Sequence, residues 1–377
     1  MGCFPHNDII SLVGETPRYD LGESVGPNLH VENILDAEDY AQLGALALGY
    51  GTAPGDGALR EILAAHHNVG ADDVVITAGG MQALFLLAFH SCSNGGEAAI
   101  LSPTFPLARN VLTGVGARIR DIPVSFDDGY RVSMERATAA ITAQTRLVCL
   151  TSPQNPSGVT IPKADIEAIL EHMAELCPQA YLLIDETYRE AAYDDAPALA
   201  SFAGADPRIV TCASLSKCHG APGLRLGWVM MVDPALREEL VRGKFNTTVA
   251  CAGVDEFLGL RVLQRRDDIL GARRARLAVG LEQTRVFVEM NANYVEWVRP
   301  DAGALCCLRL KPDRFDDQAV GAVYGRFADA DIRVGDGRWF GDAARVFRIG
   351  FGLPPKETLA EAYEIMSDIF RSDAHQQ

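Results

Sequence analysis

The stretch SLSKCHGAPGLRLGW, residues 214–228, carries most of the information about the fold. It follows the β-rich run RIVTCA and leads into another apolar run, which predicts a glycine-rich turn between two strands. Lys217 lies at the end of the first strand, and Arg225 opens the second. A lone lysine in such a turn usually lies in solvent. The pair also fits a second interpretation, an amine for covalent chemistry beside a guanidinium that binds phosphate.

Apolar runs alternate with helical stretches on both sides of this turn, from about residue 72 to residue 235. Strands are predicted at 74–77, 98–102, 117–124, 146–151, 181–185, 208–214 and 225–232, and helices at 81–92 and 163–177. Apolar strands that alternate with helices predict an α/β fold, with a mostly parallel sheet covered on both faces. In such sheets ligands bind beyond the carboxyl ends of the strands.

The rest of the chain predicts a second, smaller unit. A helical region with many charged residues covers 253–290. It is followed by predicted strands at 304–310 and 345–351 and predicted helices near 316–329 and 355–371. A chain of 377 residues exceeds what one hydrophobic core usually supports. We therefore expect a large domain at 36–270 and a small domain made of 1–35 and 271–377.

A carboxylate ends one of the predicted strands. In YLLIDETYRE, 181–190, Asp185 follows an apolar run and Tyr188 comes three residues later. A buried carboxylate is costly unless it is paired. A protonated ring nitrogen of a cofactor would pair with it, although an aspartate that caps the next turn fits the pattern as well.

Two further motifs follow predicted strands. TSPQNPSG, 151–158, is a rigid turn that holds Asn155, whose amide could contact both a cofactor and a substrate carboxylate; turn geometry alone also explains an asparagine there. TAGGMQAL, 77–84, runs from a strand through glycines into a helix. The N–H groups at such a helix start bind phosphate.

In this order, the four motifs resemble those of the class I/II aminotransferases, the aspartate aminotransferase superfamily of pyridoxal-phosphate (PLP) fold type I. The pattern SxSKxxGxxGxRxGW around Lys217, the upstream NPSG turn and Asp-x-x-Tyr carry the resemblance, which covers roughly residues 15 to 370. It implies a large domain with a mostly parallel seven-stranded sheet between helices, and a smaller α/β domain. It also implies pyridoxal 5′-phosphate, bound to Lys217 as a Schiff base.

The resemblance implies a role for each site residue. The expected catalytic residues are Lys217, Asp185 and Tyr188. The expected cofactor contacts are Gly80, Met81, Phe105, Asn155, Asp185, Tyr188, Ser214, Lys217, Arg225 and Tyr50. The expected substrate contacts are Arg348, which would grip the α-carboxylate, Asn155 and Gly26. Tyr50 would reach the phosphate in a neighbouring subunit, which implies a homodimer with shared active sites.

Composition limits the other classes of function. The net charge of −16 argues against binding to nucleic acid or to an anionic membrane. The sequence has no apolar window long enough to span a bilayer and no secretory signal at its start. Nine scattered cysteines, without spacing typical of a metal site, indicate reduced thiols in a cytoplasmic protein.

The segment YDLGESVGPNL, 19–29, differs from the sequence that is usual for the family at this place. It faintly resembles the same segment of PLP enzymes that process arginine-derived amino acids in antibiotic biosynthesis. Glu23 would lie near the substrate, although a solvent-facing glutamate fits too. Our first hypothesis is an aminotransferase of specialised amino acid metabolism, which acts on a polar or guanidino-bearing amino acid and a 2-oxo acid. The alternatives are a cyclase, lyase or oxidase like capreomycidine synthase, and a sensor domain without activity.

Overall fold

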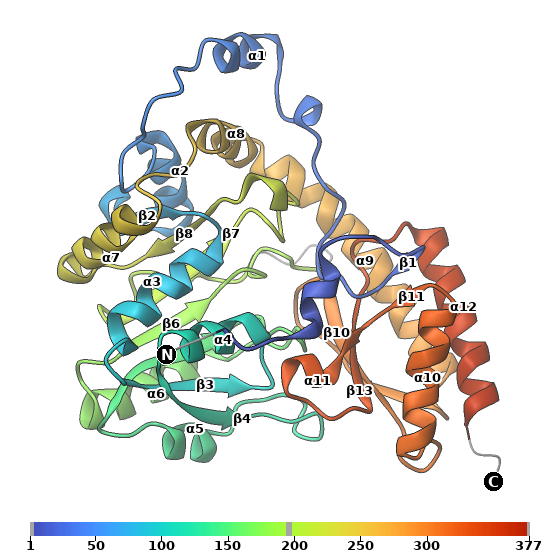
Figure 1. The fold of residues 1–377 in the computed structure, drawn as a ribbon. Coiled ribbons are helices and arrows are strands. Elements are labelled where there is room, and N and C mark those ends of the chain that lie inside the picture. The colour runs from blue at the N-terminus through green and yellow to red at the C-terminus, as the bar shows by residue number, and fades with distance from the viewer. Residues whose placement is uncertain (1–3, 194–197, 375–377) are drawn as a thin grey trace.

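The turn at 214–228 joins two neighbouring inner strands of a seven-stranded sheet in the computed structural model, which describes residues 4–193 and 198–374 (Figure 1). In spatial order its strands are β2 (Val74–Thr77), β8 (Gly227–Met230), β7 (Ile209–Ser214), β6 (Tyr181–Asp185), β5 (Thr145–Thr151), β3 (Glu97–Ser102) and β4 (Arg118–Pro123). The five strands from β7 to β4 are parallel, and β8 is antiparallel to both of its neighbours. The predicted α/β class and the mostly parallel sheet are confirmed.

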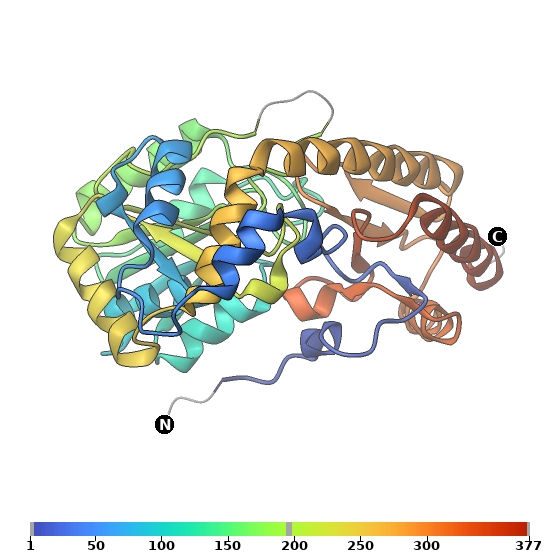
Figure 2. The same ribbon diagram turned by 90° about the horizontal axis from the view of Figure 1, so that it is seen from above.

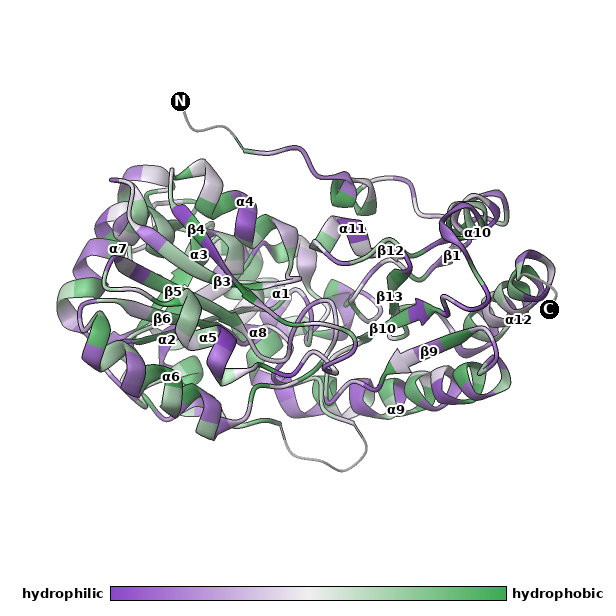
Figure 3. Ribbon diagram, turned by 90° about the horizontal axis from the view of Figure 1, so that it is seen from below, coloured by the Kyte–Doolittle hydropathy of each residue, from purple (hydrophilic) through white to green (hydrophobic). Residues whose placement is uncertain are grey.

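Helices cover both faces of this sheet because its strands, apart from the edge strand β4, are apolar on both sides. Along β5, Leu147 and Cys149 pack on one face, while Val148 and Leu150 pack on the other. The first face carries α3 (Gly80–Cys92), α4 (Pro106–Gly114) and α7 (Pro234–Thr247). The second carries α2 (Gly57–His67), α5 (Met134–Ala140), α6 (Lys163–Leu176) and α8 (Gly253–Gln264). Figure 3 shows apolar strands inside and polar helix faces outside.

Two sequence predictions need correction. The strand predicted at 225–232 begins at Gly227, because Arg225 has a left-handed backbone (φ 46°) that closes the short 3-10 helix Pro222–Leu224. The helical region predicted at 253–290 is two helices, α8 and α9 (Arg266–Met290), which meet at Arg265. α9 continues from the large sheet to a second sheet (Figure 2).

The second sheet has four antiparallel strands. In spatial order they are β12 (Gly335–Asp336), β13 (Val346–Gly350), β10 (Leu305–Leu310) and β9 (Val295–Val298). The helices of this part are α10 (Asp317–Asp329), α11 (Gly337–Phe340) and α12 (Lys356–Asp373). Side chains of α9, α10 and α12 share one core with the sheet.

The N-terminal region connects the two sheets. The short strand β1 (Tyr19–Asp20) pairs with β11 (Ile332–Arg333), and α1 (Ala37–Gly44) follows further along the chain. We call residues 21–29 between them the strap. At one end Gly350 N donates to Leu21 O at 2.7 Å, and at the other Leu29 N donates to Gly220 O at 2.8 Å. The strap therefore runs from the second sheet to the Lys217 turn.

Within the described ranges, no helix is both long and apolar enough to cross a bilayer. No group of His, Cys, Asp or Glu side chains there could hold a metal ion.

Candidate active site

The carboxyl ends of β5, β6 and β7 bring the predicted site residues to one edge of the large sheet. The strands are in parallel register, with Thr151 beside Asp185 and Asp185 beside Cys212. Asn155 follows β5, and Lys217 lies three residues beyond the end of β7. Residues that are distant in the sequence thus meet where ligands of such sheets bind.

Burial lowers the pKa of the Lys217 amine below that of an ordinary lysine. Arg348 and Arg225 lower it further, while Glu23 and Asp185 raise it. The Lys217 Nζ lies 4.0 Å from Glu23 Oε2. An amine with a lowered pKa is more often uncharged at neutral pH, which makes it a better nucleophile.

Asp185 is a carboxylate without a firmly bound cation. Burial raises its pKa, against the hydrogen bonds from Thr187 and the charge of Lys217. Its Oδ1 accepts a hydrogen bond from Thr187 N at 2.9 Å. No arginine or lysine in the part of the chain that the structure describes forms an ion pair with it. A protonated ring nitrogen would supply the missing cation.

A phosphate group fits the start of α3. Gly79, just before this helix, has φ 74°, and no side chain caps the helix, so its first N–H groups are free to bind an anion. A Cβ at Gly79 would lie 3.0 Å from Arg225 Nη2, so the guanidinium passes directly over this glycine. Ser214 ends β7 on the same side. Together they provide N–H groups, a hydroxyl and a positive charge.

A buried chain of hydrogen bonds links three predicted residues. Arg348 is 1% exposed, and its Nη1 donates to Asn155 Oδ1 at 2.7 Å. Asn155 Nδ2 in turn donates to Tyr188 Oη at 3.3 Å. The Nε of Arg348 is buried without a partner, and its Nη2 donates to the carbonyl of Gly22. A substrate carboxylate would satisfy the free Nε.

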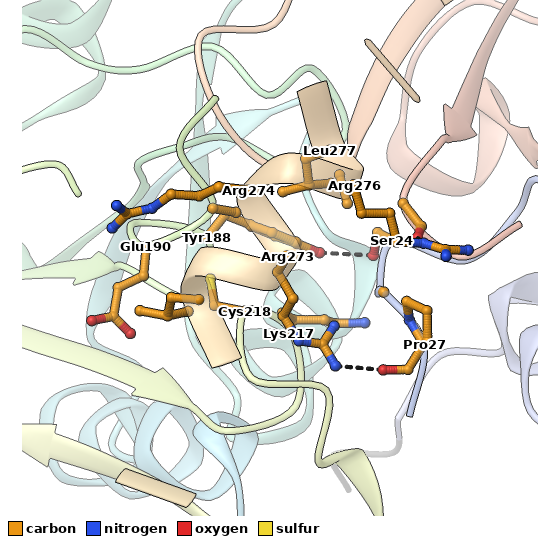
Figure 4. A pocket seen from close by; sticks show the side chains of 15 residues that line it. Ser24, Pro27, Tyr188, Glu190, Lys217, Cys218, Arg273, Arg274, Arg276 and Leu277 are labelled. Atoms are coloured by element: carbon orange, nitrogen blue, oxygen red, sulfur yellow. Dashed lines mark hydrogen bonds between the residues drawn. The ribbon is translucent and has the colours of Figure 1, made fainter. Parts of the chain in front are cut away.

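The strap contributes contacts that the sequence analysis missed. Ser24 Oγ lies 2.8 Å from Tyr188 Oη, and Arg273 of α9 donates to the Pro27 carbonyl (Figure 4). Ser24, Gly26, Tyr188, Lys217 and Arg273 all line one cavity. A Cβ at Gly26 would lie 2.3 Å from Arg273 Nη1, so this glycine makes room for the guanidinium. The glycine itself was the only signal of this contact in the sequence.

Three predicted cofactor contacts start or precede helices. Gly80 and Met81 open α3, and Phe105 directly precedes α4 at the end of β3. Tyr50 differs from the others, since it lies on the loop between α1 and α2 and is 91% exposed. Within one chain it is not part of the site.

A family model for aminotransferase class I and II matches residues 18–365. The chain belongs to this family. Its enzymes are PLP-dependent aminotransferases, so the predicted family and cofactor are confirmed. The free Asp185 carboxylate, the cradle at Gly79 and the lowered pKa of Lys217 all fit this cofactor.

Known aminotransferase-fold proteins resemble the chain to different extents. It is 36% identical to the arginine–pyruvate transaminase AruH of Pseudomonas aeruginosa over 195 residues, 49% of this chain and 48% of AruH, so this match spans about half of the relative. It is 28% identical to the capreomycidine synthase of Streptomyces vinaceus over 89% of this chain and 85% of the synthase. A PLP-dependent aminotransferase from Streptococcus suis shares the fold, with a TM-score of 0.87, 20% identity, and coverage of 99% and 100% of the two chains.

Proposed function

We propose that this aminotransferase moves an amino group between an amino acid with a cationic, guanidino-bearing side chain and a 2-oxo acid. The observation that carries this proposal is the position of Glu23. Its carboxylate lies in the site, 4.0 Å from Lys217 Nζ, with its side chain only 22% exposed. Apart from Lys217, no cationic side chain in the described ranges pairs with it.

A carboxylate beside the reacting amine favours a substrate with a distal cation. When Lys217 is bonded to the cofactor, its amine is no longer free to pair with Glu23, and the partly buried carboxylate loses this partner. A guanidinium would pair with it through two parallel hydrogen bonds. Arg348 and Asn155 would hold the α-carboxylate at the other end of the same substrate, and Gly26 would border its side chain.

The site residues divide the chemistry among them. When bound, PLP supplies a ring that accepts the negative charge left on the substrate as its α-proton is removed. Lys217 would bond to the cofactor in the resting enzyme, and its amine, once displaced by the substrate, would take the α-proton as a general base. Asp185 would keep the ring nitrogen of the cofactor protonated, while Asn155 and Tyr188 would donate hydrogen bonds to the phenolic oxygen of the cofactor.

The remaining contacts would hold the cofactor in place. Phe105 would stack on its ring. The phosphate would be bound by Ser214, Arg225 and the N–H groups of Gly80 and Met81, where the helix start and the guanidinium combine their positive charge.

A cyclase, lyase or oxidase of an arginine-derived amino acid is the second candidate. The match to capreomycidine synthase over 89% of the chain favours it. A half-reaction separates the two: the holoenzyme is mixed with L-arginine and no 2-oxo acid, and the cofactor is analysed. A transaminase converts one equivalent of PLP to pyridoxamine phosphate, whereas a cyclase or lyase returns it as PLP.

Replacing Glu23 with glutamine should raise KM for arginine roughly 10- to 100-fold, because a hydrogen bond to a charged group is worth about 1.5–3 kcal/mol. The KM for alanine should stay close to that of the wild type, since alanine has no group to pair with Glu23. Steady-state kinetics with both substrates would measure this difference.

The matched control is Glu15→Gln, which makes the same charge change at an exposed acid before the strap. If Glu15→Gln had the same effect, the overall charge and not Glu23 would attract the cation. A wild-type preference for phenylalanine or aspartate over arginine would contradict the proposed substrate class.

We also propose a homodimer in which Tyr50 serves the partner's cofactor. Tyr50 and its neighbour Leu48 are 91% and 88% exposed, which is unusual for large apolar side chains unless another surface covers them. Mixing Lys217→Ala with Tyr50→Phe protomers should restore part of the activity, because one site of each heterodimer then carries neither lesion. A fully active monomer in sedimentation would rule out this arrangement.

The domain boundaries remain a proposal, with a large domain at 36–270 and a small domain at 1–35 and 271–377. The pairing of β1 with β11 and the bond from Gly350 N to Leu21 O support placing the N-terminus with the second sheet. We propose a cytoplasmic location as well. The eight described cysteines are all free thiols, which is typical of a reducing compartment.

A further inference from the structure

We propose that Ser24 is a positioning residue, which turns the Tyr188 phenol toward the cofactor. It thereby links the position of the strap to the basicity of the Lys217 nitrogen when this nitrogen is bonded to PLP. Nothing in the family motifs marks Ser24. This role of Ser24 rests on the proposed binding of PLP at Lys217 and does not depend on which amino acid is the substrate.

The contact between Ser24 and Tyr188 is short and buried. Their oxygens are 2.8 Å apart, and both residues are 3% exposed (Figure 4). Ser24 lies near the middle of the strap, whose ends are held by the bonds from Gly350 N to Leu21 O and from Leu29 N to Gly220 O. A movement of the strap would therefore act on this hydrogen bond.

The three neighbouring strap residues each meet a different group of the site. The carbonyl of Gly22 accepts from Arg348, the carboxylate of Glu23 lies near Lys217, and the hydroxyl of Ser24 contacts Tyr188. Among these contacts, only that of Ser24 reaches the phenol expected to touch the cofactor.

The number of protons fixes the direction of this hydrogen bond in the loaded enzyme. Tyr188 has one phenolic proton to donate. Asn155 Nδ2 already donates to its oxygen at 3.3 Å. If Ser24 also donates to that oxygen, the phenolic proton is left for the cofactor's oxygen. Two donors to the phenol oxygen polarise the O–H group and make Tyr188 a stronger donor.

The charged groups around this pair stay constant when Ser24 is changed. Tyr188 is faced by Arg348 of β13, Asp185 of β6 and Glu23 of the strap. Arg225, another charged neighbour of Lys217, comes from the turn before β8. Glu190 and the α9 residues Arg273, Arg274 and Arg276 line the same cavity as Lys217 and Tyr188. Because serine carries no charge, Ser24→Ala removes a hydrogen bond and leaves all of these charges in place.

The test is a spectroscopic pH titration of the holoenzyme, following the absorbance of PLP bound to Lys217. Ser24→Ala should move the midpoint to higher pH by roughly half a unit, since an ordinary hydrogen bond is worth about 1 kcal/mol and only part of it is passed on. The midpoint rises because Tyr188 becomes a weaker donor and stabilises the negative phenolic oxygen of PLP less. The Lys217 nitrogen bonded to PLP then holds its proton more firmly.

Two further variants separate positioning from a general structural effect. Ser24→Thr keeps the hydroxyl and should titrate like the wild type. Tyr188→Phe should raise the midpoint by itself, and adding Ser24→Ala to it should cause no further change. An unchanged or lowered midpoint in Ser24→Ala would overturn the proposal, as would an additional shift of the same size in the Tyr188→Phe background.

Discussion

Replacing Lys217 with alanine should lower kcat by about 10⁴-fold or more, because a positioned general base alone contributes up to roughly 10⁴-fold. The covalent attachment of the cofactor is lost in the same variant. The phosphate contacts proposed at the start of α3 do not involve Lys217, so the variant should still bind PLP. Pre-steady-state measurement of the half-reaction with arginine would give the rate.

Lys163→Ala is the matched control for this variant. Lys163 begins α6, and its side chain is 76% exposed and pairs with Glu167 of the same helix. It should keep wild-type turnover. A Lys217→Ala variant within tenfold of the wild type would show that another residue removes the α-proton.

Replacing Asp185 with asparagine should lower kcat by roughly 10²- to 10³-fold, the loss typical of removing one preorganised group that stabilises charge in the transition state. An amide has no negative charge with which to hold the proton on the ring nitrogen. The loss should appear in kcat more than in KM, because the interaction matters most as charge develops.

Asp206→Asn provides the comparison for Asp185. Asp206 lies in the turn before β7 and pairs with Arg208, away from the site. Its substitution should leave kcat unchanged and affect only stability. If Asp185→Asn retained PLP and a near-normal kcat, Asp185 would have a structural role at the strand end instead.

The central sheet could be predicted because its strands, apart from the edge strand β4, are buried on both faces. Such strands are short apolar runs bounded by turns, and the runs at 74–77 and 181–185 coincide with β2 and β6. The break at Arg265 could not be seen, since the helical pattern continues across it. The start of β8 was misplaced because the left-handed backbone of Arg225 arises from the turn and not from residue type.

The position of Asn155, Asp185 and Lys217 at one edge of the sheet could also be predicted, because each lies at or shortly after the end of a strand. Their roles in catalysis stay predictions. The strap could not be predicted, since it has no periodic pattern and its contacts come from distant parts of the chain. Ser24 is 164 residues from Tyr188 in the sequence, and Arg273 reaches Pro27 across 246 residues. For the same reason the sequence alone does not decide whether Glu23 faces the substrate or solvent. Its distance of 4.0 Å to Lys217 Nζ and its low exposure support a position facing the substrate.

We expect Lys217 to carry the cofactor, and borohydride reduction identifies the lysine that does. The holoenzyme is reduced with borohydride, which makes the bond between PLP and the enzyme permanent, and is then digested and analysed by tandem mass spectrometry. We expect one equivalent of the reduced cofactor per chain, on Lys217 within the SLSKCHG segment. Cofactor on any other lysine, or a chain that binds PLP but yields no labelled peptide, would contradict it.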